Sequence, residues 1–164
     1  MNKNKDINIK IEDYILNCRV VAIIEEDNKI LFQKKEHDKY WSLPGGKIEI
    51  GEKTIDALKR ELKEELGITN FNVETLIIVS EHFFTFKNNK YHQFIFGHKV
   101  KYLDNKKTLK ELEFKGIEKD KNLIFKWFDK EKLESLPIKP DFLGQKLKNI
   151  TENEVTFISY KENN

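Results

Sequence analysis

The chain has 164 residues, which is enough for one domain with a buried core. Its 30 basic and 28 acidic side chains give a net charge of +2, and this balance argues against a nucleic-acid-binding protein with a strongly basic face. The sequence has no apolar run long enough to span a membrane and no apolar segment typical of a secretory signal near its start. The single cysteine, Cys18, cannot form an internal disulfide, which suits a reducing cytoplasm. We expect one domain over residues 1–164, with a core of about 16–150.

In chain order, residues 19–35 predict a β-hairpin, because two apolar runs flank the turn residues Asp27 and Asn28. A loop then leads to a Pro-Gly-Gly sequence at 44–46. A helix is expected next over residues 54–66, with Thr54 as its N-terminal cap and a glycine at its C-terminal end.

The second half of the chain predicts further strands. Residues 73–86 and 91–102 read as two long strands joined by a turn at 87–90, and residues 123–128 as another strand. The charged stretch 104–122 between them is expected to be a mobile surface excursion.

Near the end of the chain we expect a short helix from Asp129, then a helix from about Asp141 that buries Leu143, Leu147 and Ile150, and an edge strand at 154–160. Since strands and helices alternate while hairpins are also present, the predicted fold is α/β, a mixed sheet between helices.

The helix over 54–66 carries two stripes of side chains. At about 100° per residue, an apolar stripe should face the core: it contains Ile55, Leu58, Leu62 and Leu66. A second, acidic stripe borders it and contains Glu61, Glu64 and Glu65.

Two interpretations of the acidic stripe remain open. A solvated acidic face explains Glu64, which can pair with Arg60 one turn earlier, but it leaves Glu61 and Glu65 as a repelling pair four residues apart. A hard divalent cation such as Mg²⁺ would remove that repulsion, and a backbone carbonyl of the glycine pair could supply a further oxygen ligand.

The spacing of these residues resembles the Nudix box. Gly46 is followed after five residues by Glu52, and seven residues later by the run Arg60-Glu61-Leu62-Lys63-Glu64-Glu65-Leu66-Gly67-Ile68. The resemblance implies the Nudix fold, with a mixed β-sheet sandwiched between helices. It also implies a hydrolase that uses Mg²⁺ or Mn²⁺ to cleave a nucleoside diphosphate linked to another group.

Roles follow from the resemblance by position. Arg60 would orient the glutamates, and Glu52 would support the geometry of loop and helix. The implied metal ligands are the Gly45 carbonyl oxygen and the carboxylates of Glu61, Glu64 and Glu65. The general base stays open between a glutamate of the box and five other acids, which are Glu81, Glu111, Glu113, Glu118 and Asp120.

Substrate contacts are predicted outside the box. Lys34, Lys35 and Lys47 lie close enough in sequence to the glycine loop to contact phosphates. Aromatic side chains are candidates to stack on a base, with burial in the core as the alternative: they are Phe83, Phe84, Phe86 and Trp127.

The expected partner is a small nucleotide such as a dNTP, rather than a nucleic-acid polymer or a membrane. The proline that the ADP-ribose subgroup carries beyond the box has no counterpart, since none occurs between Pro44 and Pro137. Alternatives are a nucleotide-binding module without turnover and a hydrolase of a non-nucleotide diphosphate. The oligomeric state is left open, with a homodimer as one option.

Overall fold

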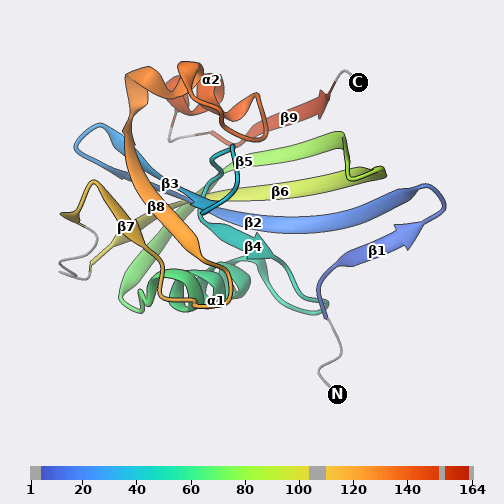
Figure 1. The fold of residues 1–164 in the computed structure, drawn as a ribbon, viewed down its shortest axis with the longest axis horizontal. Coiled ribbons are helices and arrows are strands. Elements are labelled where there is room, and N and C mark those ends of the chain that lie inside the picture. The colour runs from blue at the N-terminus through green and yellow to red at the C-terminus, as the bar shows by residue number, and fades with distance from the viewer. Residues whose placement is uncertain (1–4, 104–109, 152–153, 163–164) are drawn as a thin grey trace.

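A computed structural model describes residues 5–103, 110–151 and 154–162 of the chain. Within them, nine strands form one sheet whose main path is β7-β8-β3-β2-β6-β5-β9, while β1 and β4 pair with β2 (Figure 1). The strands are β1 (Asn8–Ile11), β2 (Tyr14–Glu26), β3 (Lys29–Lys35), β4 (Gly45–Lys47), β5 (Phe71–Phe86), β6 (Asn89–Tyr102), β7 (Glu113–Lys115), β8 (Leu123–Asp129) and β9 (Thr156–Lys161). The helical segments are α1 (Thr54–Leu66), the 3-10 helix η2 (Lys130–Ser135) and α2 (Leu143–Lys148).

Two tight turns build the hairpins. Asp27 and Asn28 have positive φ angles of 49° and 60° between β2 and β3, and Lys87 and Asn88 have 48° and 63° between β5 and β6. Two successive residues with positive φ match the twist of paired strands. Both predicted hairpins are therefore confirmed. The sheet is mixed because β2 pairs with β6 in parallel and with β3 and β4 antiparallel.

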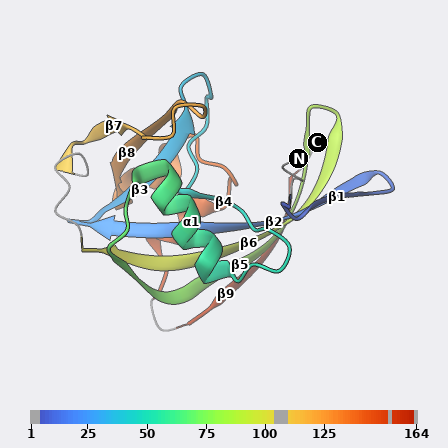
Figure 2. The same cartoon turned by 90° about the horizontal axis from the view of Figure 1, so that it is seen from below.

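Helices cover both faces of the sheet (Figures 1 and 2). Side chains that alternate along β2 belong to two separate cores. Val20 packs on the α1 side with Leu58, whereas Ile23 packs on the other side with Leu147 of α2. Burying a side chain of this size stabilises the fold by ~1.5–3 kcal/mol. The predicted α/β/α arrangement is confirmed.

Helix α1 has the predicted length, but its rotation differs from the prediction. Gly67 ends it in the left-handed conformation with φ 63°, as expected. The predicted cap is wrong: Lys53 occupies the cap position, no side chain caps the helix, and Thr54 Oγ1 lies 3.3 Å from His98 Nε2 instead.

The prediction that Ile55 faces the core is also wrong, because this residue is 40% exposed. The helix buries its Ala57 side against the sheet, and this rotation carries two glutamates inward. The buried residues of α1 are Ala57, Leu58, Glu61, Leu62, Glu65 and Leu66.

The C-terminal elements follow the prediction in part. Leu143 and Leu147 of α2 are buried, and β9 pairs with β5 at one edge of the sheet. The prediction for Ile150 is wrong, because α2 ends at Lys148 and Ile150 is only partly buried beyond it. Of the charged stretch 104–122, residues 104–109 lie outside the described residues. In the remainder, β7 forms a short strand that the sequence did not predict, and its Phe114 is buried in the α1-side core.

None of the helices in the described part of the chain is both long and apolar enough to cross a membrane.

Candidate active site

The candidate site lies where β4 meets α1, and the two glycines of β4 allow this contact. Gly45 has φ +133°, and a Cβ there would overlap the carbonyl oxygen of Val20 on the neighbouring strand β2. A Cβ on Gly46 would overlap the carboxylate of Glu61. Residues without a side chain are therefore required for β4 to pack between β2 and the helix.

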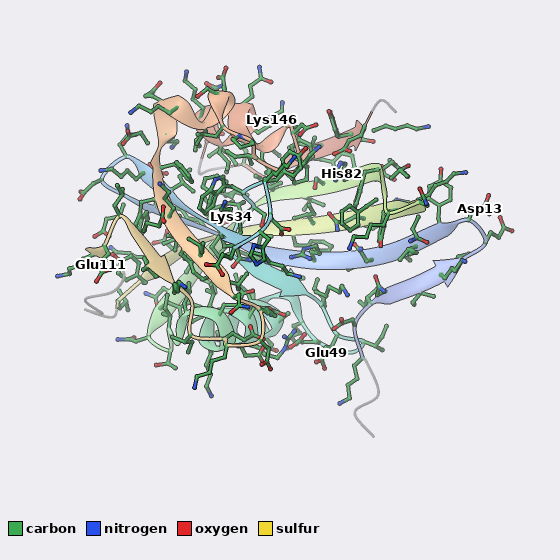
Figure 3. All side chains as sticks on the ribbon, in the orientation of Figure 1. Asp13, Lys34, Glu49, His82, Glu111 and Lys146 are labelled. Carbon is green, nitrogen blue, oxygen red and sulfur yellow. The ribbon has the colours of Figure 1, made fainter. Side chains whose placement is uncertain are left out.

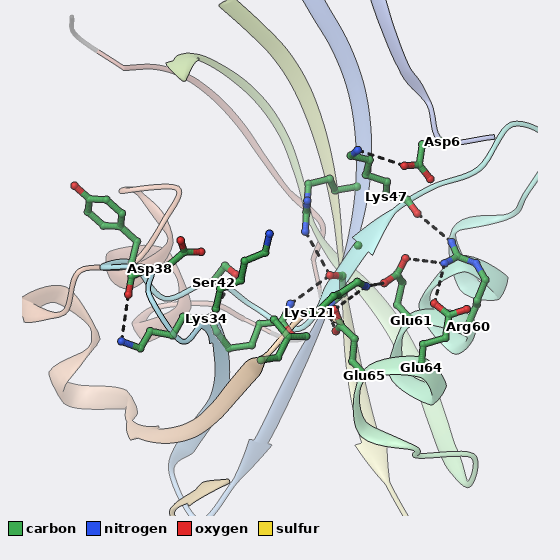
Figure 4. A pocket seen from close by; sticks show the side chains of 17 residues that line it. Asp6, Lys34, Asp38, Ser42, Lys47, Arg60, Glu61, Glu64, Glu65 and Lys121 are labelled. Carbon is green, nitrogen blue, oxygen red and sulfur yellow. Dashed lines mark hydrogen bonds and ion pairs between the residues drawn. The ribbon is translucent and has the colours of Figure 1, made fainter. Parts of the chain in front are cut away.

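Arg60 connects the loop before α1 and β4 to the carboxylates of the helix, and Figure 4 shows its contacts with Lys47 and Glu61. Its Nε atom donates a hydrogen bond of 2.9 Å to Glu52 Oε1, and Nη2 donates one of 2.9 Å to Glu52 Oε2. Nη1 donates a hydrogen bond of 2.7 Å to Glu61 Oε1. Nη2 also donates to the carbonyl oxygen of Lys47 at 3.0 Å. The hydrogen bond from Arg60 lowers the pKa of Glu52 below its ordinary value. One guanidinium thus fixes the loop, β4 and the helix together.

Glu61 and Glu65 are buried, and each has an incomplete set of partners. The side chains of Glu61 and Glu65 are only 7% and 3% exposed. Glu65 Oε2 accepts a hydrogen bond of 3.3 Å from the Gly45 backbone N–H, while Glu61 Oε2 accepts none. Burial, opposed by the charge of Lys121, raises the pKa of Glu65 to about 7. Buried carboxylates need neighbouring positive charge or a bound proton to offset the cost of their desolvation.

Lys121 supplies part of that charge from the segment between β7 and β8. Its Nζ atom lies 3.5 Å from Glu61 Oε2 and 3.5 Å from Glu65 Oε1. The same atom forms an ion pair of 2.9 Å with Glu118. Glu64 is different: it is 47% exposed and lies 3.6 Å from Arg60 Nη1.

The glutamates of α1, Arg60 and Lys121 line a pocket of about 560 Å³ in which acidic and basic side chains are interspersed (Figure 4). Asp6 and Asp38 also line it, and Asp6 forms an ion pair of 3.3 Å with Lys47. Lys34, Lys35 and Lys47 line the same pocket, in agreement with their predicted proximity to the glycine loop. Among the described residues of its lining, Tyr40 is the one aromatic side chain.

Arg19 and Gln33 are pocket residues that the sequence reasoning missed. Arg19 Nη2 and Gln33 Nε2 both donate hydrogen bonds of 3.3 Å to the Gly45 carbonyl oxygen. The sequence carried a signal for Arg19, because this residue and Arg60 are the only two arginines of the chain. The structure places both of them in the pocket lining. Gln33 had no such signal, since its inward orientation depends on the register of β3.

The aromatic residues predicted to stack on a base lie elsewhere. Trp127 is 6% exposed and belongs to the core beneath α1. Phe83 and Phe84 lie on β5 and contact the rings of His92 and His82, and His82 is far from α1 (Figure 3). Phe86, at the end of β5, is exposed. The structure does not bring any of these four aromatics to the pocket lining.

The candidate bases are also dispersed. Glu81 contacts His92 at 3.0 Å, and Glu113 contacts Lys126 at 2.7 Å, both away from the pocket lining. Glu111 lies at the outer end of the molecule, beyond β7 (Figure 3). Asp120 is exposed and is not part of the lining. Glu118 is not part of the lining either, but its ion pair with Lys121 places it next to the site.

The donor atoms suit a hard divalent cation, although they are not gathered around one point. Among the described residues, no group of three or more His, Cys, Asp or Glu side chains is already arranged to hold a metal ion. Arg60 and Lys121 instead form ion pairs with these carboxylates. The buried Glu61 Oε2 has no hydrogen-bond donor, and oxygen ligands of this type are those that Mg²⁺ and Mn²⁺ prefer.

Comparison with known proteins gives partial matches to curated relatives. The chain is 46% identical over 52 residues to an ADP-ribose pyrophosphatase of Methanocaldococcus jannaschii, covering 30% of this chain and 31% of the relative. It is 47% identical over 53 residues to the CTP pyrophosphohydrolase of Escherichia coli, covering 30% and 39%. It is 42% identical over 69 residues to the human 8-oxo-dGDP phosphatase, covering 39% and 21%. The matches thus span well under half of each relative.

Solved structures share the fold over most of the chain. The crystal structure of a MutT protein from Bacillus halodurans has a TM-score of 0.61 at 16% identity, with 88% of this chain and 89% of that chain covered. A Nudix hydrolase from Nitrosomonas europaea has a TM-score of 0.56 at 18% identity, with 89% and 79% covered. The family model for the NUDIX domain matches residues 15–150. With the box on β4 and α1 and this match over most of its length, the chain belongs to the Nudix family.

Proposed function

We propose that this protein is a divalent-metal-dependent hydrolase that cleaves a phosphoanhydride bond in a small nucleoside diphosphate derivative. The observation that carries the proposal is the pair of buried carboxylates, Glu61 and Glu65, in a pocket that is also lined by Lys34, Lys35 and Lys47. A diphosphate bound to a metal ion needs carboxylates for the ion and positive charge for the phosphates.

Glu61, Glu64 and Glu65 would hold the cation, which is Mg²⁺ or Mn²⁺. When bound, such an ion neutralises phosphate charge and increases the acidity of a coordinated water. The Gly45 carbonyl oxygen is the fourth proposed ligand, and it already accepts hydrogen bonds from Arg19 and Gln33. It would therefore have to give up part of that bonding to join the ligand set.

Other residues of the chain have supporting roles in the proposal. Arg60 holds Glu61 in a fixed direction through its 2.7 Å hydrogen bond, and Glu52 holds Arg60. Lys47 and Lys34 line the pocket, where they would bind the phosphates of the substrate, and Lys47 would leave its ion pair with Asp6 to do so. For the proton from water, we retain a helix glutamate or Glu118 as the base.

The substrate class rests on the relatives and on the pocket. The matched relatives are named for ADP-ribose, CTP and 8-oxo-dGDP, so a nucleotide is common to all three names. A dNTP, canonical or oxidised, remains our first choice. The pocket lining, which has Tyr40 as its one aromatic residue among the described residues, favours a second candidate, a non-nucleotide diphosphate.

A substrate panel tests the proposal. The purified protein is incubated with dNTPs, 8-oxo-dGTP, CTP, ADP-ribose, a nucleotide sugar and a non-nucleotide diphosphate, with Mg²⁺, Mn²⁺ or EDTA. We expect release of a nucleoside monophosphate that depends on the metal. Turnover confined to the non-nucleotide compound would select the second candidate. Binding of a nucleotide with no turnover of any compound would indicate a binding module.

Mutation of Glu65 separates the metal site from the rest of the pocket. Glu65→Gln should abolish turnover and weaken Mn²⁺ binding in calorimetric titration, because it removes one carboxylate charge without changing the shape of the side chain. Asp56→Asn, on the exposed side of the same helix, is the matched control and should bind Mn²⁺ as the wild type does. Equal Mn²⁺ affinity of the wild type and Glu65→Gln would refute the proposed ligand set.

A further inference from the structure

The segment 116–122 between β7 and β8 is attached to the C-terminal part of α1. The Ile117 backbone N–H donates a hydrogen bond of 2.9 Å to the carbonyl oxygen of Glu65. A Cβ on Gly116 would lie 3.0 Å from the same oxygen and 2.8 Å from the ring of Phe125. The close fit at Gly116 fixes where the segment passes the helix, and this position brings Lys121 over the buried carboxylates.

Lys121 and Arg60 divide the oxygens of Glu61 between them. Arg60 binds Oε1, whereas the Lys121 ammonium lies 3.5 Å from Oε2. The same ammonium lies 3.5 Å from Glu65 Oε1, so it contacts both buried carboxylates, while Arg60 contacts only one of them. The Lys121 side chain is 37% exposed, which leaves it a path into solvent.

A divalent cation held by Glu61 and Glu65 would need the oxygens beside which Lys121 now lies. An ammonium and a divalent cation repel each other strongly at such short range in a partly buried site. They cannot both occupy the space between these two carboxylates.

We propose that the ammonium of Lys121 neutralises Glu61 and Glu65 in the metal-free protein and is displaced when a divalent cation binds. This inference rests on the metal site of the proposed function and adds a competitor to it. Arg60 remains in place in both states, because it binds the other oxygen of Glu61 and is also held by Glu52.

Glu118 gives the displaced ammonium a partner. It lies three residues before Lys121 and already forms the shortest of its three carboxylate contacts, at 2.9 Å. A flexible lysine stem can keep this ion pair while it turns toward the pocket or the solvent. Lys121 therefore loses its contacts with Glu61 and Glu65 and keeps the one with Glu118, while the ion binds Glu61 and Glu65.

Titration of Mn²⁺ into matched variants tests the competition. Lys121→Met should bind Mn²⁺ more tightly than the wild type, on the order of tenfold, because the ion no longer displaces a competing charge. Lys119→Met is the control, since Lys119 is an exposed lysine of the same segment and the same charge is removed. It should change the affinity by about twofold or less. Equal or weaker binding by Lys121→Met would overturn the inference.

Chemical labelling of the wild-type protein tests displacement without any mutation, in case the variant folds poorly. Lysine amines are acylated briefly, and each site is quantified by mass spectrometry with and without Mg²⁺. We expect the labelling of Lys121 to rise severalfold when Mg²⁺ binds, with Lys119 unchanged. Labelling of Lys121 that stays constant or falls, while calorimetry shows binding, would refute the inference alone. Absence of Mn²⁺ and Mg²⁺ binding by the wild type would instead refute the proposed metal site, and the inference with it.

Discussion

Replacement of Arg60 by lysine is a sharp test of how the site is held together. Arg60 makes four hydrogen bonds: two to Glu52, one to Glu61 and one to the Lys47 carbonyl. They leave the guanidinium in three directions of one plane. A lysine keeps the charge but has a single nitrogen, so it cannot bind both carboxylates with this geometry.

The expected magnitude follows from the bonds lost. A hydrogen bond to a charged group contributes about 1.5–3 kcal/mol, and the lysine recovers some of the four. We therefore expect Arg60→Lys to lower the free energy of unfolding by about 1–3 kcal/mol. Because Glu61 loses its fixed direction, turnover should fall by about 10–100-fold, as is typical when a residue that orients a metal ligand is changed.

The assay combines urea unfolding in EDTA with steady-state turnover in Mg²⁺. Lys59→Arg, the reverse exchange on the exposed face of the same helix, is the control and should change neither quantity. Wild-type turnover and stability in Arg60→Lys would mean that the charge of residue 60 is sufficient. In that case the reasoning from the planar contacts would be wrong.

Three further changes test other parts of the structure. Gly46→Ala should weaken Mn²⁺ binding in calorimetry, because the added methyl group overlaps the Glu61 carboxylate. Trp127→Ala should lower the free energy of unfolding by about 3–5 kcal/mol in urea while leaving KM unchanged, because the ring belongs to the core and not to the pocket lining. Between the ordinary pKa of 4.5 and its raised value of about 7, Glu65 holds a proton in the folded state that the unfolded chain has released. The stability of the metal-free protein should therefore fall as the pH rises through this window and level off above it, and Glu65→Gln should flatten that part of the profile.

The order of the elements was accessible from the sequence because local signals determine it. Asp27 and Asn28 tolerate the positive φ angles of the β2–β3 turn, and Gly67 ends α1. The rotation of α1 was not accessible in the same way. A helical wheel ranks positions by hydrophobicity, so it placed Ile55 inward, whereas packing against β4 required the Ala57 side.

The candidate site was predictable where its residues are adjacent in sequence. The glutamates of α1, Arg60 and Gly45 are parts of one continuous motif. Arg19 and Lys121 come from β2 and from the segment before β8, and only the pairing of distant strands brings them to the motif. A lysine in a chain with many lysines carries no signal by itself, which is why Lys121 could not be identified from the sequence.

The distribution of charge in the pocket limits how the proposed enzyme could recognise its substrate. Arg19 and three lysines, Lys34, Lys35 and Lys47, line the pocket together with the carboxylates. Phosphate groups are shared by every candidate substrate, so contacts with these residues raise affinity without selecting a base. Tyr40, which is 51% exposed, is the one ring of the described lining that could stack on a base. If selectivity among nucleotides exists, it must therefore arise at Tyr40 and the polar groups around it, and Tyr40→Ala should reduce the differences in kcat/KM between nucleotides more than it reduces their common rate.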